Sequence, residues 1–512
     1  MLVKAFSCAV IGIGAIKISI EVHITQGIRF FIVGLADHAI RESQQRIEAA
    51  LSNKGFEWPR FRVVINLAPA DIRKEGSHFD LPLAVGILAA TQQLSEERLG
   101  EYLILGELSL DGSVVPVKGV LPMVLLAREK QFRGVIVPAG NAAEAMVVDG
   151  IEVVVVSDLS EVVSFLNGEP IDCQSAAKVT ANTEQSSPNT HADFSEVKGQ
   201  AVAKRAMLIA AAGSHNLILV GPPGSGKSMM ARRLPSIMPP MSLEESLQTT
   251  RIYSVAGKVS AERGLISTRP FRTPHHSSSN IAIIGGGSSP QPGEISLSHN
   301  GVLFLDELPE FKSGVLEVMR QPLEDREIHI SRANYRVTYP ADFMLVAAMN
   351  PCPCGFYNHP DKECNCGPGV IKRYLSRISG PLLDRIDIHM EVVPVPFQQL
   401  SQHLGEEGSK AMREVVQGTR QIQQNRFAGI DHVFCNARMG TALRNRFCKL
   451  DSAGSSLIRM AMESLGLSAR AYDRILKVAR TIADLEQCEL IHPSHVAEAI
   501  NYRNLDREGW SG

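Results

Sequence analysis

The chain has 512 residues, of which 44% are hydrophobic and 21% charged, and its formal net charge is −2. This composition is typical of a soluble globular protein, and the length suits two or three domains. The near-neutral charge points to neither a nucleic-acid nor a membrane partner, so any DNA contact must come from a local patch. Nine cysteines without a secretion signal indicate a reducing cytoplasm, which disfavours structural disulfides.

Residues 1–168 are predicted to form an α/β domain. The apolar bursts between Met1 and Ile24 are interrupted by charged residues, which excludes a signal peptide or a membrane-spanning helix and favours strands. Other short apolar runs predict strands, and helical spacing of apolar residues predicts helices. The strands are expected at about 18–22, 30–33, 62–66 and 134–137, and the helices at about 37–53, 80–93 and 119–131.

Residues 169–192 are predicted to be a flexible linker. From Gln174 to Ala192 the chain is rich in Ser, Thr, Asn, Gln and Ala and nearly lacks large apolar residues. Such a segment cannot bury enough apolar surface to offset the entropy of ordering. A second domain is therefore expected over residues 193–394.

The most informative motif of this second domain is a glycine-rich loop between a predicted strand, Asn216–Val220, and a predicted helix. The eight residues after the strand fit the phosphate-binding pattern G-x-x-x-x-G-K-[ST]. In this pattern backbone N–H groups and the helix N-terminus bind phosphates, the lysine reaches the β- and γ-phosphates, and the serine ligates Mg²⁺. The motif predicts ATP and Mg²⁺ as cofactors, held by Gly221, Pro222, Pro223, Gly224, Ser225, Gly226, Lys227 and Ser228.

Two later apolar runs end in polar side chains. The run Val302–Leu305 is followed by Asp306 and Glu307, and a second buried-strand pattern ends at Asn350. Asp306 is predicted to hold Mg²⁺ together with the loop serine, and Glu307 to orient and activate the attacking water. Asn350 is predicted to sense the γ-phosphate or to place the water. The alternative for the acid pair is a strand end that faces solvent.

Arg385 follows a leucine pair in Leu382-Leu383-Asp384-Arg385. A second cation on the γ-phosphate in the transition state accelerates hydrolysis by roughly 10³–10⁵. Such an arginine can come from a neighbouring subunit, in which case the enzyme would be silent as a monomer. The alternative is a surface salt bridge with Asp384 or Asp387.

Two insertions of this domain are candidates for contact with DNA. Residues 327–338 alternate apolar and polar side chains around Ala333-Asn334, which predicts a hairpin. Arg332 at its tip and Arg336 are predicted to meet phosphates, and the alternative is an ordinary surface hairpin. A second stretch, about 272–300, is rich in glycine and is expected to be a mobile loop rather than a packed element.

Four cysteines gather in one short Pro- and Gly-containing stretch. They are arranged as two C-x-C pairs separated by nine residues. Four thiolates suit tetrahedral zinc, although this spacing is tighter than the common C-x-x-C pattern. The alternative is four reduced cysteines in a flexible loop, and His359 inside the loop is a candidate substitute ligand. The predicted zinc ligands are Cys352, Cys354, Cys364 and Cys366.

Residues 395–512 are predicted to form a helical lid domain. Apolar residues recur at helical spacing in four segments, and Pro493 with Ser494 marks the start of the last one. The segments are 409–425, 454–464, 468–486 and 493–503.

Several of these motifs together resemble a known family. The runs Arg269–His276, Pro292–Leu297 and Gly301–Glu307 look like those of magnesium-chelatase-like AAA+ ATPases, and Asn350–Gly355 with Leu382–His389 resembles the ComM/YifB subfamily. The resemblance covers nearly the whole chain. It implies a AAA+ ATPase that assembles as a hexameric ring and acts on DNA, in branch migration of recombining DNA during natural transformation.

The resemblance also assigns three roles by position. Asn350 corresponds to sensor 1, Arg385 to the arginine finger, and Arg470 in Leu467-Ser468-Ala469-Arg470 to sensor 2 of the lid. Arg474 lies one turn away, so it is the alternative for sensor 2.

The amino-terminal domain resembles the Lon protease domain, chiefly through Gly106–Gly112 and Val115–Val117. Lon uses a serine–lysine dyad, but His78 stands at the serine position, and no lysine stands at Leu121–Met123. Ser77 and Lys118 are off register. A serine without an activating base is a poor nucleophile, so a non-proteolytic domain is expected.

The leading functional hypothesis is therefore a cytoplasmic, ATP-driven DNA motor that moves single-stranded or branched DNA through a homo-oligomeric, hexameric ring. Recombination proteins are candidate partners, and no membrane contact is expected. The alternative is a chelatase-like remodeller of proteins that does not act on DNA. A third reading, an ATP-dependent protease, is opposed by the missing dyad.

Overall fold

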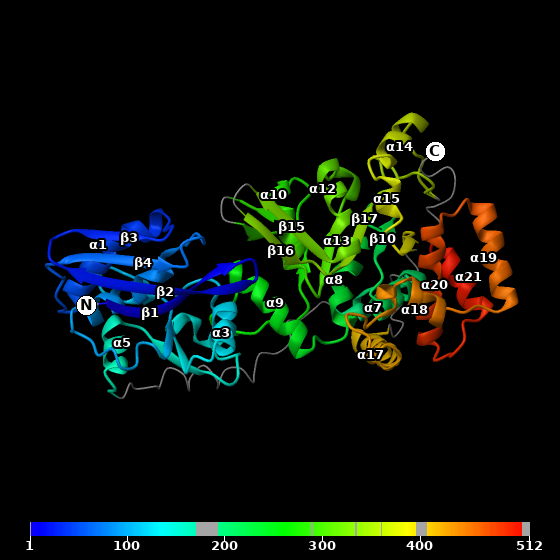
Figure 1. The fold of residues 1–512 in the computed structure, drawn as a ribbon. Helices are drawn as coiled ribbons and strands as arrows, with labels where there is room; N and C mark the ends of the chain where they lie inside the picture. Colours follow the sequence, from blue (N-terminus) through cyan, green and yellow to red (C-terminus); the bar gives the residue numbers. More distant parts are fainter. Residues whose placement is uncertain are drawn as a thin grey trace.

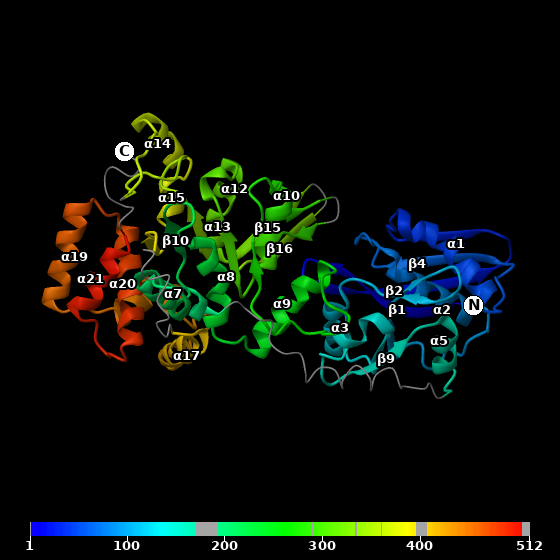
Figure 2. The ribbon, with the colours of Figure 1, turned by 180° about the vertical axis from the view of Figure 1, so that it is seen from behind.

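The computed structural model describes residues 2–169, 193–287, 290–332, 335–359, 361–395 and 407–503. Most of the predicted linker, residues 170–192, lies outside the described residues. Figures 1 and 2 show three bodies in a row: an amino-terminal α/β body, a central α/β body and a carboxy-terminal helical body. No described helix is long and apolar enough to cross a membrane.

The amino-terminal body is built on a seven-stranded mixed sheet with the order β3-β4-β2-β1-β5-β8-β9. β1 and β2 form an antiparallel hairpin, β2 also pairs antiparallel with β4, and the other neighbours are parallel. All four strands expected from the sequence are present. The strands are β1 (Leu2–Ile11), β2 (Gly14–Thr25), β3 (Phe30–Val33), β4 (Arg62–Ala68), β5 (Tyr102–Ile104), β8 (Gly134–Pro138) and β9 (Glu152–Val156).

The helices of this body cover the sheet. All eleven residues of α2 (Asp80–Ala90) are buried, which is why its sequence is apolar on every side. Its one acidic residue, Asp80, is paired with Arg46 of α1 at 2.7 Å. The remaining elements are α1 (His38–Asn53), β6 (Glu107–Leu108), β7 (Val114–Val115), α3 (Val120–Glu129), α4 (Ala142–Ala145) and α5 (Leu159–Leu166).

The central body contains a five-stranded parallel sheet with the order β11-β14-β17-β10-β18. Its three inner strands are fully buried apolar runs, as expected for a parallel sheet covered on both faces. The strands are β10 (Leu217–Val220), β11 (Phe271–Arg272), β14 (Val302–Leu305), β17 (Met344–Met349) and β18 (Ile388–Glu391). The surrounding helices are α7 (Ala201–Gly213), α8 (Lys227–Ile237), α9 (Leu243–Val255), α12 (Ser313–Val318), α13 (Arg320–Asp325), α14 (Pro368–Leu375) and α15 (Gly380–Leu383).

Two insertions extend this sheet domain, and one differs from expectation. The glycine-rich stretch 272–300 is not an unpacked loop over its described residues: Ile283 and Ile295 are fully buried in the same apolar cluster as strand β14. Its described residues, two of the glycines included, form four short elements, two of which are helices that each bury an isoleucine. These are α10 (Asn280–Ile284), β12 (Gly285–Gly286), β13 (Gln291–Pro292) and α11 (Glu294–Leu297).

The second insertion is the expected hairpin, with β15 (Glu327–Arg332) paired antiparallel to β16 (Tyr335–Pro340). Side chains alternate between a buried face, which includes Ile328 and Val337, and an exposed face. One face of the hairpin therefore packs on the central body, and the other is open to solvent.

The carboxy-terminal helices form an amphipathic bundle that shares a core with the central body. Buried residues of α7 and β10 belong to the same apolar cluster as those of α17 and α20. The central body and these helices are therefore joined by one continuous apolar core. The helices α17 (Ser409–Arg426), α19 (Ser452–Leu465), α20 (Ala469–Leu485) and α21 (Pro493–Asn501) lie close to the four expected ranges, whereas α18 (Thr441–Phe447) was not expected.

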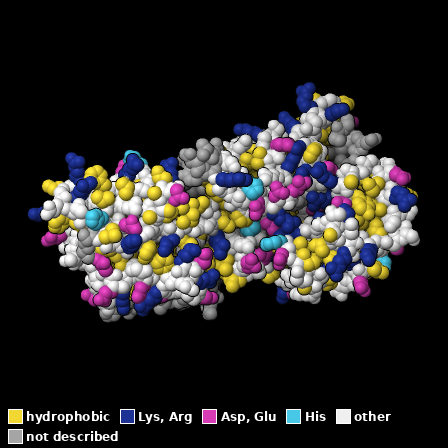
Figure 3. Space-filling model, viewed as in Figure 1, with side chains coloured by type: hydrophobic (Ala, Val, Ile, Leu, Met, Phe, Trp, Pro, Cys, Tyr) yellow, Lys and Arg dark blue, Asp and Glu magenta, His cyan; other side chains and the backbone are white. Residues whose placement is uncertain are grey.

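The amino-terminal body meets the central body through α3 and α9, which lie side by side in Figures 1 and 2. The N–H of Gly119 donates to the carbonyl of Ser254 at 3.0 Å. Basic and acidic side chains are interspersed over the face in Figure 3, in keeping with the net charge of −2.

Candidate functional site

The phosphate-binding motif, Asp306 and Asn350 lie at one edge of the central sheet. Strands β10, β14 and β17 run parallel, with Val220 opposite Met349 and Leu305 opposite Ala347. The residues that follow the three strands therefore leave the sheet at the same edge, where parallel α/β sheets bind their ligands. The topology thus brings together candidates that are up to 129 residues apart in the chain.

The glycine-rich loop has the backbone that the motif requires. Gly224 has φ 77° and Gly226 has φ 89°, and a Cβ atom at either position would meet nothing within 4 Å. The space beside these two glycines is therefore open, and it lies directly before Lys227, the first residue of helix α8. Gly221 is needed for packing instead, because a Cβ there would lie 2.2 Å from the carbonyl oxygen of Val392.

Lys227 is buried and folded back on the loop. Its Nζ donates to the carbonyls of Gly221 at 2.7 Å and Pro222 at 2.9 Å, and lies 3.3 Å from Asn350 Oδ1. Burial lowers the pKa of Lys227, and only the nearby Asp306 carboxylate opposes this shift. A buried ammonium held mainly by neutral oxygens is suited to an anion, so the loop fits a phosphate group.

Ser228 and Asp306 are in direct contact. The Ser228 hydroxyl donates to Asp306 Oδ2 at 2.7 Å. A hydroxyl oxygen and a carboxylate are hard oxygen donors of the kind that Mg²⁺ prefers, usually with phosphate oxygens and water completing its shell. These two residues would hold the ion between them and the nucleotide.

Glu307 has a strained backbone and a partner that the sequence did not indicate. Its φ is 52°, a left-handed conformation that costs about 1 kcal/mol or more for a residue of this type. The side chain is 57% exposed, and Oε2 lies 3.4 Å from His276 Nδ1. His276 comes from the glycine-rich insertion and stacks on His275, with ring centroids 4.1 Å apart. His276 is thus the described side chain that contacts the Glu307 carboxylate.

Asn350 lies between the lysine and a buried tyrosine. Its side-chain oxygen is near Lys227 Nζ, and its backbone is hydrogen-bonded to Tyr374 of α14. Burial raises the pKa of Tyr374 to about 12, so this phenol stays protonated. Tyr374 is a second residue that sequence reasoning missed, because no motif marks it.

Arg385 does not lie at this edge. It comes three residues before Ile388, which is opposite Leu217 at the first position of β10. The guanidinium contacts Glu324 at 2.7 Å and the carbonyl of Pro381 at 2.6 Å, so neither predicted surface partner, Asp384 or Asp387, holds it. The side chain is 10% exposed, and its Nε has no hydrogen-bond partner among the described residues.

The two sensor-2 candidates lie near the same opposite edge but in different surroundings. Arg470 is 58% exposed and only 3.9 Å from Asp384. Arg474 forms a 2.9 Å ion pair with the buried Asp387. Although burial by itself raises the pKa of Asp387, Arg474 and His215 hold it well below its ordinary value. Arg474 is therefore committed to a structural pair, whereas Arg470 is available to a ligand.

The hairpin places one predicted DNA-contacting arginine on its open face. Arg336 is exposed opposite Ser331, next to the pair of His329 and Thr338. It also lines a cleft of 1310 Å³ between the hairpin and the amino-terminal body. Arg332 ends β15 in register with Tyr335, and the predicted turn at 333–334 lies outside the described residues.

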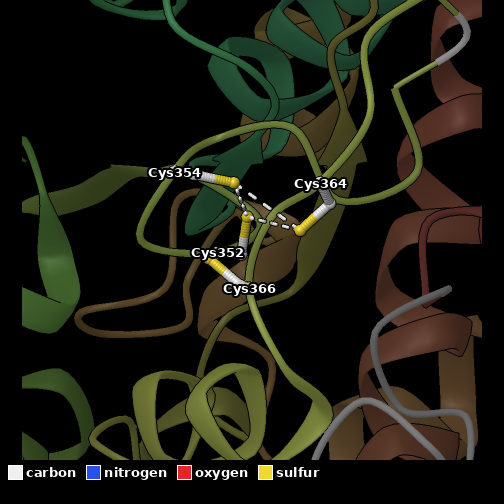
Figure 4. Close-up of side chains that lie close together, drawn as sticks. All are labelled: Cys352, Cys354, Cys364 and Cys366. Atoms are coloured by element: carbon white, nitrogen blue, oxygen red, sulfur yellow. Dashed lines mark hydrogen bonds between the residues drawn. The ribbon is translucent and has the colours of Figure 1, made fainter.

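The four cysteines converge, as Figure 4 shows. The Sγ atom of Cys364 lies 3.7 Å from that of Cys352 and 3.6 Å from that of Cys354, and one ligand atom from each of the four lies within 4.8 Å of all the others. All four are free thiols. His359 is not part of the group, because its Nδ1 accepts hydrogen bonds from the N–H groups of Asp361 and Lys362. The donor set fits a tetrahedral zinc ion.

The residues near the expected protease dyad make other contacts. Ser77 Oγ donates to the carboxylate of Glu107, and His78 Nε2 lies 2.9 Å from the carbonyl of Cys8. Both line the same cleft as Lys118. The described partner of the serine is thus an acid rather than the lysine that a dyad requires.

Family models match the chain in three segments. Residues 20–141 match the model described as subunit ChlI of Mg-chelatase, residues 193–400 the model of magnesium chelatase subunit ChlI, and residues 406–503 the model of its C-terminal part.

Curated relatives extend over the whole length. Competence protein ComM of Haemophilus influenzae is 45% identical over 510 residues, which is 98% of this chain and 97% of the relative. The uncharacterized protein YifB of Escherichia coli is 41% identical over 501 residues, 98% and 96% of the two chains. Lon protease 2 of Bacillus subtilis is 27% identical over 143 residues, 28% of this chain and 25% of the protease.

Proposed function

Because this chain belongs to the family of ComM and YifB, which is built from magnesium-chelatase ChlI-like domains, we propose that it is an ATP-hydrolysing, ring-forming motor that moves DNA. Family membership makes it a magnesium-chelatase-like ATPase with ATP and Mg²⁺ as its cofactors. The ring, the hexameric state and the coupling to DNA are the proposed part.

The observation that carries the proposal is the division of the hydrolysis residues between two edges of one sheet. Lys227, Ser228 and Asp306 meet at the carboxyl edge, whereas Arg385 precedes β18 at the amino edge. An arginine there cannot serve the phosphate site of its own subunit. A complete site would need the arginine of a neighbour, which is the logic of a ring with head-to-tail contacts.

The residues at the carboxyl edge have separate roles. Lys227 binds phosphate oxygens and neutralises their charge, and Ser228 with Asp306 holds the metal ion. Glu307 accepts the proton of the attacking water, with His276 fixing its carboxylate. Asn350 positions that water against the γ-phosphate. When bound, ATP with Mg²⁺ supplies the bond whose cleavage drives movement.

The hairpin β15–β16 is the proposed DNA contact. It is inserted directly before β17, the strand that Asn350 follows, so a movement of the hairpin would reach the hydrolysis site along one short strand. Arg336 on its open face and Arg332 at its end would bind phosphates without reading sequence. Recombination intermediates are the proposed substrates, as the family resemblance implies, and one relative is named a competence protein.

Arg470 is the proposed sensor 2. It is exposed beside Asp384, one residue before Arg385, whose guanidinium would have to leave Glu324 to reach a neighbour's nucleotide site. Arg474 is the weaker candidate because moving it would leave the buried Asp387 unpaired.

A second candidate function is a protein remodeller of the chelatase type, which the match of residues 193–400 to the chelatase subunit favours. The two functions predict different activators of the same ATPase. DNA should stimulate a DNA motor, whereas a remodeller should respond to a protein partner and ignore DNA.

The deciding experiment is steady-state ATPase of the full chain with and without forked and four-way DNA, over a series of protein concentrations. Stimulation by branched DNA that rises steeply with protein concentration supports the assembled DNA motor. Flat turnover that DNA does not change would refute it, and Lys227→Ala protein is the control for contaminating ATPases.

A further inference from the structure

We propose that the four cysteines hold one zinc ion. We also propose that the loop which this ion closes, called the zinc loop, positions the glycine-rich phosphate-binding loop and Asn350 for nucleotide binding. This inference rests on nucleotide binding by the proposed ATPase, but not on its action on DNA. The zinc loop is defined here as residues 352–366.

The sulfur positions fit one small ion. A zinc–sulfur bond of about 2.3 Å in a tetrahedron places neighbouring sulfurs about 3.8 Å apart. The closest separations among Cys352, Cys354 and Cys364 are 3.3, 3.6 and 3.7 Å. These are too long for disulfides, and three sulfurs this close together do not fit an iron–sulfur cluster, in which each iron takes at most two of the four cysteines.

The surroundings also favour a metal. Among the described residues of the loop, only Cys352 and Gly355 are buried, and the loop joins the neighbouring apolar cluster only through its four cysteines. A metal cross-link supplies the missing stabilisation, as in other small metal sites. The backbone N–H of Tyr357 donates to Cys352 Sγ at 3.3 Å, which helps to satisfy a metal-bound thiolate.

The loop is seated directly on the phosphate-binding loop. Gly355 has φ 84°, and a Cβ atom there would lie 2.5 Å from Cδ and 2.9 Å from Cγ of Pro223. The Gly355 N–H donates to the carbonyl of Cys352 at 3.0 Å, so the turn that touches Pro223 is closed by a zinc ligand. Asn350 stands two residues before that ligand.

The same segment therefore borders the nucleotide from two sides. Asn350 approaches Lys227 from β17, and Gly355 covers Pro223. If the ion is removed, the turn at Gly355 loses its anchor, and both contacts become free to shift. The expected result is weaker nucleotide binding in addition to a less stable loop, because a small displacement of positioning groups is costly.

The first test measures metal in the intact full-length protein. Elemental analysis should give one zinc per chain, and titration of thiols with a mercurial should release it. Cys366→Ser should lose the zinc, whereas Cys448→Ala, at a buried cysteine outside the loop, should keep it. Protein purified without zinc, or with iron in its place, would overturn the metal assignment.

The second test separates positioning from metal binding and covers the case in which Cys366→Ser does not fold. Gly355→Ala should keep its zinc but bind a fluorescent ATP analogue about tenfold more weakly, a loss of about 1.4 kcal/mol. Gly150→Ala is the matched control, because its φ of 83° imposes the same backbone strain and a Cβ there meets nothing within 4 Å. Unchanged affinity in Gly355→Ala would overturn the positioning role.

These results are distinguishable from failure of the proposed function. Loss of DNA stimulation in the unaltered protein would refute the motor and leave zinc content and nucleotide affinity as they are. Conversely, zinc-free Cys366→Ser protein that binds the analogue as tightly as the unaltered protein would refute the zinc loop alone.

Discussion

Arg385→Ala protein mixed with Lys227→Ala protein should recover ATPase activity that neither variant has alone. The strand β10 and its flanking residues, Asn216 to Gly221, span five steps of about 3.3 Å, or about 16 Å. An arginine side chain has six bonds of about 1.5 Å from Cα to its terminal nitrogens, so it reaches less than about 9 Å. Arg385 therefore cannot touch its own phosphate site, and under the shared-site proposal the arginine of a neighbouring subunit completes that site.

The size of the recovery follows from the geometry. Each variant alone should lose about 10³-fold or more in kcat, since either the phosphate lysine or the arginine is missing from every site. In a random equal mixture, half of the sites have an intact loop and half of those face an intact arginine. About a quarter of the unaltered activity per subunit should return, provided that sites act independently.

The assay is coupled ATPase at a protein concentration that favours assembly. The matched control mixes Lys227→Ala with Glu307→Gln, because both changes damage the same edge and no site in that mixture is complete. Recovery in the control, or none in the test mixture while assembly is intact by light scattering, would refute the shared site.

Three further outcomes are expected. Glu307→Gln should bind ATP normally and hydrolyse it about 10²–10⁴-fold more slowly in single-turnover assays, while Glu310→Gln nearby should not; normal turnover of the first variant would exclude Glu307 as the base. Arg336→Ala should lower the salt dependence of DNA binding by about one unit of the log–log slope, and an unchanged slope would remove it from the DNA contact. Asp387→Asn should lower the free energy of unfolding by about 3 kcal/mol in denaturant titrations, because Arg474 is left unpaired. The folded-state pKa of the Asp387 carboxyl is depressed, so its contribution to the free energy of unfolding is fully present above its unfolded pKa of about 4 and is lost as the pH falls further. A difference in stability between Asp387→Asn and the unaltered protein that grows in acid would contradict the pairing.

The parts predicted well from the sequence are those fixed by local patterns. The strand, glycine turn and helix around Lys227 follow from one continuous motif, and the strands before Asp306 and Asn350 are unbroken apolar runs. The order of those parallel strands in the sheet could not be predicted from any one of them. Asp306 and Asn350 could nevertheless be placed at strand ends, because each directly follows an apolar run. Four of the five described α-helices after residue 408 follow from the spacing of their apolar residues, whereas α18 does not.

The parts that could not be predicted depend on contacts between distant segments. Nothing in the run around Arg385 tells which edge of the sheet it occupies, because that is decided by the pairing of β18 with β10. The contact of His276 with Glu307 joins segments 31 residues apart. The prediction of an unpacked loop at 272–300 is wrong because its glycines mask two short helices, each of which buries one isoleucine fully, Ile283 or Ile295.

The sequence left the four cysteines undecided for a related reason. A C-x-C pair can turn its thiols together or apart, and only closure of the loop between Cys354 and Cys364 shows that both pairs face one point. No sequence pattern predicts the contact of Gly355 with Pro223, because glycine is common in turns for many reasons.

The phosphate-binding residues and Arg385 lie at opposite edges of one sheet, and this separation sets how many complete sites an assembly of subunits can have. Under the shared-site proposal, each head-to-tail contact completes one site, from the carboxyl edge of one subunit and the amino edge of its neighbour. An open row of subunits always has one fewer working site than it has members, with an idle nucleotide pocket at one end and an idle arginine at the other. Closing the ring pairs that last pocket with that last arginine, so ring closure itself activates one further site. If the ring opens to admit a DNA strand, the nucleotide pocket at the gap is inactive until the ring closes around the strand.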